Sequence, residues 1–219
     1  MLTLPWATST VVPDRDRITA WRTRGVSTRV VAPTFEPVDL EFVKLHSRID
    51  TTDGDAVVEM RIQAAREWCE RYTGRAFLKQ TWDWTITDSD ITHAGPILLP
   101  VVPVISVVSV TSYDAAGTGT VMSNTLYFVD TASVPARVLL NEGSSWPSGL
   151  RLHNSLIVRY LAGYGTDGLD PEQVPVAIRQ AILLLASEFN ERNEAATDLK
   201  LAEVPFGVCA LLDPYRVHG

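Results

Sequence analysis

The chain has 219 residues, a mass of 24.1 kDa, a formal net charge of −7 and 46% hydrophobic residues. This composition is typical of globular proteins and excludes fibrous and fully disordered classes. The length favours one domain with an appendage over two full domains. No apolar run approaches the roughly 20 residues of a membrane-spanning helix, and the N-terminus lacks the pattern of a signal peptide. We therefore expect synthesis in the cytoplasm and no membrane partner.

Charge is distributed unevenly along the chain. Residues 1–36 carry five arginines against three acidic residues, a net charge of +2, which leaves −9 for the remainder. No lysine or arginine occurs between Lys79 and Arg137. Proteins bind DNA through lysines and arginines that neutralise phosphates, so the body of this protein is a poor candidate for DNA binding. An acidic surface remains compatible with DNA that slides past without sticking.

The first 36 residues show neither helical periodicity nor sustained alternation, and they contain several prolines. This pattern predicts an extended arm. Two isolated tryptophans, Trp6 and Trp21, lie within the arm. Because exposed tryptophans invite association, we predict that both anchor the arm on neighbouring subunits, on the portal or on the capsid. An arm that folds back onto the core of its own chain explains the same residues equally well.

Four helices are predicted beyond the arm. Residues 38–50 suit a short amphipathic helix, and a longer one begins with Asp53 as its N-cap and ends at Gly74. A wide apolar stripe predicts a third helix over residues 174–192, and a last short helix is predicted over residues 208–212. The helical segments therefore lie in two groups, far apart in the sequence.

Between the two helical groups the sequence changes to the pattern of β-strands. Strands are predicted at 81–87, 104–110, 126–129, 137–140 and 155–161. We therefore predict the α+β class: a helical body, in which the N-terminal helix pair packs with the C-terminal helices, with an inserted small antiparallel β module. The predicted boundaries are an extended N-terminal arm over 1–36 and one domain over 37–219, helical at 37–76 and 172–216 and β-rich at 77–166.

One motif resembles a cofactor-binding loop. Residues 163–168 fit the pattern G-x-G-x-x-G after a predicted strand. However, the next helix starts about six residues later, nearby carboxylates would repel phosphate, and no strand follows that helix. A strand-to-helix turn, in which glycine provides positive φ, explains these residues better.

No other group of residues predicts chemistry. The four histidines show no metal-binding spacing, and no serine lies in a nucleophile motif. Cys69 and Cys209 lie in helical patterns and are predicted to be buried free thiols. No two carboxylates have the unlike environments that a general acid and base require. We predict no catalytic residues, no metal, no cofactor and no enzyme activity.

Six groups of residues, in a fixed order over 36–217, carry a resemblance to a known family. They are EPVDL with VKLHSRID at 36–50, AAREWCERYTGRA at 64–76, QTW at 80–82, AGYG at 162–165, VP with IRQAILLL at 174–185, and VPF with ALL and PYR at 204–216. Together they resemble the head-to-tail connector (adaptor) proteins of tailed double-stranded DNA bacteriophages and gene transfer agents. The long N-terminal arm departs from that family's pattern.

The resemblance implies a structural protein of the virion neck. It implies a ring, typically of twelve copies, below the portal, which extends the DNA channel and presents a platform for the next neck or tail protein. The implied partners are further copies of the chain, the portal, a downstream stopper or tail protein, and genome DNA that passes through the lumen without sequence-specific binding. If carboxylates of the body line this lumen, their repulsion of DNA phosphates is expected to keep the genome mobile.

The family's C-terminal segment reaches toward the portal, which gives predicted contact residues in this chain. These are Phe206, Leu211, Leu212, Tyr215 and Arg216. For the two leucines, burial in the protein's own core is an equally good explanation.

Two alternative functions fit parts of the sequence. Other neck or tail-end proteins, such as stoppers and tail terminators, also form rings. A β-rich carbohydrate-binding virion protein is suggested by Trp82, Trp84 and Trp146, because aromatic platforms bind sugars. Alternate tryptophans in one strand share a face, however, and are more often core residues.

Overall fold

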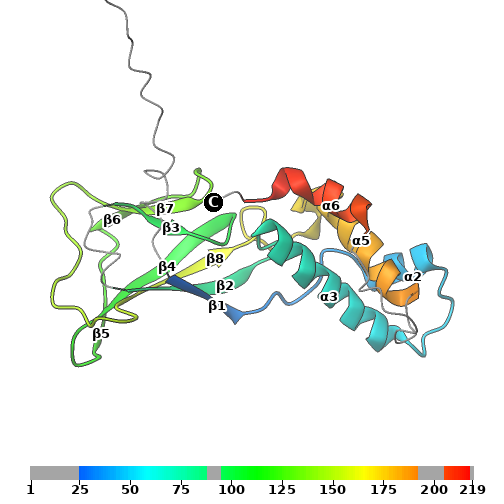
Figure 1. Cartoon of the computed structure of the whole chain (residues 1–219), viewed down its shortest axis with the longest axis horizontal. Coiled ribbons are helices and arrows are strands. Elements are labelled where there is room, and N and C mark those ends of the chain that lie inside the picture. Colours follow the sequence, from blue (N-terminus) through cyan, green and yellow to red (C-terminus); the bar gives the residue numbers. More distant parts are fainter. Residues whose placement is uncertain (1–24, 88–94, 192–204, 218–219) are drawn as a thin grey trace, which may run out of the picture.

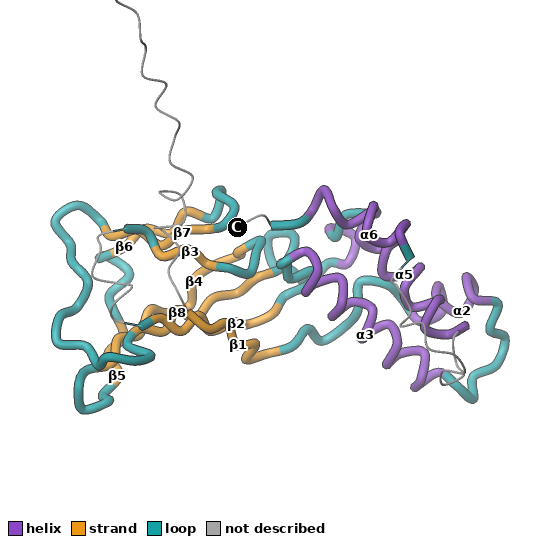
Figure 2. The backbone as a smooth tube through the Cα atoms, in the orientation of Figure 1, coloured by secondary structure: helices purple, strands orange, loops and turns teal. Residues whose placement is uncertain are grey.

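A computed structural model describes residues 25–87, 95–191 and 205–217. The described residues form helices and two antiparallel sheets, so the class is mixed α+β. The strands gather at one end of the molecule and the helices at the other (Figures 1 and 2). No helix in the described ranges is both long and apolar enough to cross a membrane.

The helical end is built from both helical groups of the sequence. Its helices are α2 (Leu40–Ser47), α3 (Asp55–Thr73), α5 (Val176–Glu191) and α6 (Phe206–Leu212). Helix α5 contacts each of the other three. The apolar stripes of the helices form one core together with Phe77 and Leu78, which follow α3 and are fully buried. Burial of each large apolar side chain contributes roughly 1.5–3 kcal/mol, so this shared core holds the two groups together.

The predicted N-cap of α3 is wrong. The helix begins at Asp55, the N-cap position is occupied by Gly54, and no side chain caps the helix. The Asp55 carboxylate instead accepts a hydrogen bond from Lys44 Nζ at 2.7 Å, which ties α2 to α3. The predicted end at Gly74 is confirmed, since this residue adopts the left-handed conformation with φ 71°.

The strands form a larger sheet in the order β1-β2-β8-β4-β5 and a smaller sheet in the order β3-β7-β6. Their bounds are β1 (Gly25–Val31), β2 (Gln80–Ile86), β3 (Ile97–Leu99), β4 (Val104–Tyr113), β5 (Gly119–Val121), β6 (Tyr127–Asp130), β7 (Ala136–Leu140) and β8 (Leu156–Ala162). All five predicted strands are present, whereas β1, β3 and β5 were not predicted. Side chains from both sheets form a second core, in which Ile86, Val138 and Tyr160 are fully buried.

Strand β1 comes from the predicted N-terminal arm. It pairs antiparallel with β2, with Thr28 opposite Asp83, and forms one edge of the larger sheet. Residues 25–31 of the arm therefore lie on their own chain, as the alternative interpretation of the arm expected. Trp6 and Trp21 lie outside the described residues.

The glycine-rich segment after β8 connects the sheets to the helical end. Gly165 and Gly168 adopt φ of 83° and 67°. A Cβ atom at Gly163 would lie only 2.8 Å from the backbone of Leu78, so the close approach of two chain segments requires glycine here. Lys79 N donates a hydrogen bond to Gly168 O at 2.7 Å. The segment is thus a packed turn that leads into η1 (Pro171–Gln173) and α5.

Candidate interaction surfaces

The described residues contain two thiols and no cluster of metal-binding side chains. No group of three or more His, Cys, Asp or Glu in these ranges is placed to hold a metal ion. Cys69 and Cys209 are free thiols, the first buried and the second half-buried. Burial raises the pKa of the Cys69 thiol to about 12, so it stays protonated and unreactive at neutral pH.

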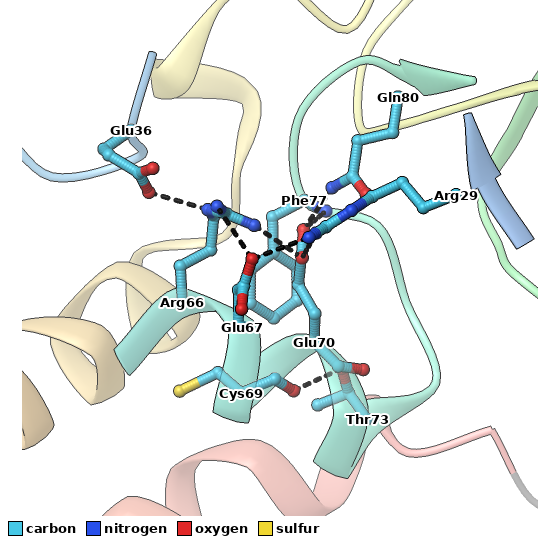
Figure 3. A network of polar contacts seen from close by, with 9 residues as sticks. All are labelled: Arg29, Glu36, Arg66, Glu67, Cys69, Glu70, Thr73, Phe77 and Gln80. Atoms are coloured by element: carbon cyan, nitrogen blue, oxygen red, sulfur yellow. Dashed lines mark hydrogen bonds and ion pairs between the residues drawn. The ribbon is translucent and has the colours of Figure 1, made fainter. Parts of the chain in front are cut away.

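A buried charge network joins β1, the segment after it and α3 (Figure 3). Arg66 of α3 is only 1% exposed. Its Nε donates a hydrogen bond to Glu36 Oε2 at 2.7 Å, and its Nη1 donates to Glu70 Oε2 at 2.8 Å. Arg29 of β1 donates from Nη2 to Glu67 Oε1 at 2.6 Å. The network therefore fixes the end of β1 and the following residues against the helical end.

Glu70 is the most connected carboxylate of this network. Besides Arg66, its Oε1 accepts hydrogen bonds from the backbone N–H of Phe77 at 2.9 Å and from Gln80 Nε2 at 2.5 Å. Burial raises the pKa of the Glu70 and Glu36 carboxyls, and the Arg66 guanidinium opposes the rise. Glu70 thus connects α3 to the start of β2, and Arg66 supplies the positive charge that a buried carboxylate requires.

A groove with a volume of about 1150 Å³ lies beside the network. Its walls are residues 32–40, the first half of α3 and the start of α5. The exposed apolar side chains that line it are Phe42 at 56%, Met60 at 61% and Val176 at 70% exposure. The groove could not be predicted from the sequence, because its three walls come from segments that are far apart along the chain. Each lining residue on its own has the pattern of an ordinary protein surface.

The C-terminal residues with predicted portal contacts differ in their exposure. Phe206 is 87% exposed at the start of α6, whereas Leu212 is fully buried in the helical core. Leu211 and Tyr215 are partly buried against the same core. The Arg216 guanidinium is exposed and lies over the Tyr72 ring, 4.8 Å from its centroid. The core explanation therefore holds for Leu212, whereas Phe206 and Arg216 are exposed and Tyr215 is half-buried.

Three carboxylates of the arginine- and lysine-free stretch have structural partners. Asp83 lies opposite Arg159 in the sheet and accepts two hydrogen bonds from it, at 2.8 and 2.7 Å. Asp114 and Asp130 accept backbone hydrogen bonds that close the turns after β4 and β6. A hydrogen bond from Ser133 lowers the pKa of Asp130. Asp83 is thus neutralised by its partner, whereas Asp114 and Asp130 combine a negative charge with a role in turn formation.

The tryptophans of the β end do not form an exposed platform. Trp84 is buried at 7% exposure, and Trp82 and Trp146 are half-buried against the second core. Both β2 tryptophans contact this core, as expected for alternate residues that share one face. The arrangement gives the carbohydrate-binding alternative no support.

Comparison with known proteins bears on the predicted family resemblance. Residues 37–129 match the family model described as phage gp6-like head-tail connector protein. The resemblance is confirmed. The matched connector segment includes α2, α3 and the strands from β2 to β5. No curated protein matches the chain.

Chains from gene transfer agent (GTA) particles share the fold. A chain from the virion of a native GTA particle matches with a TM-score of 0.68 and 22% identity. A chain from the neck of an empty GTA particle computed with C6 symmetry gives 0.68 and 24%, and one from the neck of a native GTA particle computed with C12 symmetry gives 0.64 and 22%. Each match covers 89% of this chain and 96% of the other. The fold shared with these chains therefore extends well beyond residues 37–129.

Proposed function

We propose that this protein is a structural head-to-tail connector of the virion neck, with no enzymatic role. It forms a ring below the portal, extends the DNA channel and offers the attachment platform for the next neck or tail protein. The observation that carries this proposal is the agreement of two comparisons: the connector family model over 37–129, and the fold of GTA neck chains over 89% of this chain. In this proposal residues 37–219 are one domain, since helices on both sides of the β-rich insert share one core.

A closed ring requires two different, complementary surfaces on each copy. Two surfaces of the chain are candidates for contacts between copies. One is the groove, and the other is the free edge of β1, where Val26, Val30 and Val31 are 65%, 46% and 51% exposed. The fold match to a neck computed with C12 symmetry supports twelve copies as the working number.

We place the portal contact on the C-terminal surface formed by Phe206, Tyr215 and Arg216. Aromatic residues and arginine are enriched at interface hot spots, and Phe206 and Arg216 are both exposed. Leu212 anchors α6 in the core and presents Phe206 outward. Leu211 is half-buried and lies between the core and the exposed surface.

Mass measurement of the purified protein, alone and mixed with portal, tests the proposed function. We expect a ring of about twelve copies on the portal, with the monomer as a permitted state in isolation because partner binding drives assembly. If the protein does not bind the portal but binds a preformed connector ring, it is a stopper or tail terminator instead. Absence of any ring with either partner contradicts the proposal.

The lumen hypothesis gives a further prediction for the acidic residues. The double variant Asp114→Asn/Asp130→Asn removes two negative charges but keeps an oxygen that accepts the turn hydrogen bonds. If these residues face the DNA channel, weaker repulsion of phosphates is expected to slow genome release. Release is measured by dye accessibility of DNA after triggered ejection, with the melting temperature as the control for folding. Unchanged release from intact particles contradicts a lumenal position for these residues.

A further inference from the structure

We infer that the groove between residues 32–42, α3 and the start of α5 receives the N-terminal segment, residues 1–24, of a neighbouring copy. The inference rests on the proposed ring and names the contact that joins adjacent subunits. It follows from the chemistry of the groove, the composition of the segment and the point at which the segment leaves the fold.

The groove combines apolar surface with negative charge. Phe42, Met60 and Val176 are each more than half exposed, although large apolar side chains are stabilised by burial. Of the charged residues lining the groove, Glu36, Asp39, Glu59 and Glu172 are acidic, and Arg66 and Arg179 are basic. Arg66 pairs with Glu36 and Arg179 with Glu172, so the net charge of −2 on the lining comes from Asp39 and Glu59. A ligand for this groove therefore needs apolar side chains and positive charge.

Residues 1–24 have this composition. They contain four arginines, at positions 15, 17, 22 and 24, against Asp14 and Asp16, a net charge of +2. They also contain Trp6 and Trp21, and tryptophan and arginine are the residues most enriched at interface hot spots. The segment and the groove are thus complementary in both charge and hydrophobicity.

The position of the segment favours a neighbouring copy over its own chain. Strand β1 runs toward the helical end (Figure 1). Its last residue, Val31, leads directly into residues 32–40 of the groove wall, and Gly25 is at the other end of the strand. To fill its own groove, the segment would have to reverse at Gly25 and return along β1. Fully extended, 24 residues reach up to about 80 Å, several times the radius of gyration of about 17 Å for a compact chain of this length. A segment that exits away from its own groove and reaches the same groove of the next copy gives the head-to-tail contact that closes a ring.

Photo-crosslinking of the full-length protein tests the contact. The crosslinking residue p-benzoylphenylalanine replaces Met60 in the groove or, as a control, Val108 of β4, which is 55% exposed and lies outside the groove. Isotopically light and heavy copies are mixed and assembled with portal, and crosslinked peptides are identified by mass spectrometry. We expect position 60 to crosslink to peptides of residues 1–24 from a copy of the other isotope, and position 108 to give no such product.

A charge variant adds a second measurement. Glu59→Lys is expected to lower the yield of this crosslink roughly fivefold, the scale of one exposed ion pair. Glu142→Lys, at an exposed position outside the groove, is the matched control and is expected to leave the yield unchanged. The inference is overturned if position 60 crosslinks only within one copy, or only to segments other than residues 1–24. In that case, a ring that still forms on the portal leaves the proposed function intact. Absence of the ring itself contradicts both.

Discussion

Arg66→Met should lower the free energy of unfolding at pH 7 by about 3–5 kcal/mol, because removal of one partner leaves buried charges uncompensated. The variant keeps most of the side-chain volume but removes the guanidinium that contacts Glu36 at 2.7 Å and Glu70 at 2.8 Å. Urea unfolding followed by circular dichroism measures the loss. Arg159→Ala is the control, since this side chain is 46% exposed and its ion pair with Asp83 is expected to contribute about 1 kcal/mol or less. Equal losses for the two variants would contradict a stabilising role of the network.

The loss caused by Arg66→Met should depend on pH. Burial already raises the pKa of Glu36 and Glu70 above the ordinary glutamate value of 4.5, and removal of Arg66 takes away the charge that opposes the rise. An acid with a raised pKa in the folded state favours folding below its unfolded pKa, and this contribution is lost as the pH rises through the folded value. The destabilisation should therefore be smallest below about pH 4.5 and largest at neutral pH. A loss that is constant or grows toward acid pH would contradict this explanation.

Leu212→Ala and Phe206→Ala should separate folding from portal binding. Leu212 is fully buried, so its truncation is expected to cost about 2–5 kcal/mol of stability. Phe206 is 87% exposed, so its truncation should change stability by no more than about 0.5 kcal/mol. If Phe206 is a hot spot of the portal contact, its removal should weaken portal binding by about 2 kcal/mol, roughly a 30-fold change in the dissociation constant.

The measurements for this pair are urea unfolding and equilibrium binding to purified portal. Full portal affinity of Phe206→Ala would remove α6 from the proposed contact. A mild effect of Leu212→Ala on stability would contradict the assignment of this residue to the core.

The helices could be predicted from the sequence because their signals are local. Apolar residues at steps of three and four identify α3 and α5, and both lie within two residues of their expected bounds. The same periodicity also indicates that Leu212 is a core residue, because Leu212 follows Val208 by four residues and both are buried in the core. The N-cap of α3 was not predictable in the same way, because Asp55 has a partner, Lys44, on another helix.

The three strands that were not predicted show no hydrophobic alternation in the sequence. Strands β3 and β5 have three residues each, too few to show alternation. Strand β1 lies at the sheet edge and is exposed on most of its length, so its sequence shows no hydrophobic alternation. Its β-branched residues do favour a strand; they are Val26, Thr28, Val30 and Val31. The groove and the charge network depend on contacts between distant segments, such as Glu36 with Arg66, which no local pattern reveals.

The assignment to the virion neck is tested most directly by a cryo-electron microscopy reconstruction of the particle that contains this protein. The proposed function predicts a ring of this chain directly beneath the portal, around the DNA channel, with Phe206 and the C-terminal residues of each copy against the portal. Density for the chain at the far end of the tail, on the capsid surface or in a form without rotational symmetry around the channel would contradict it.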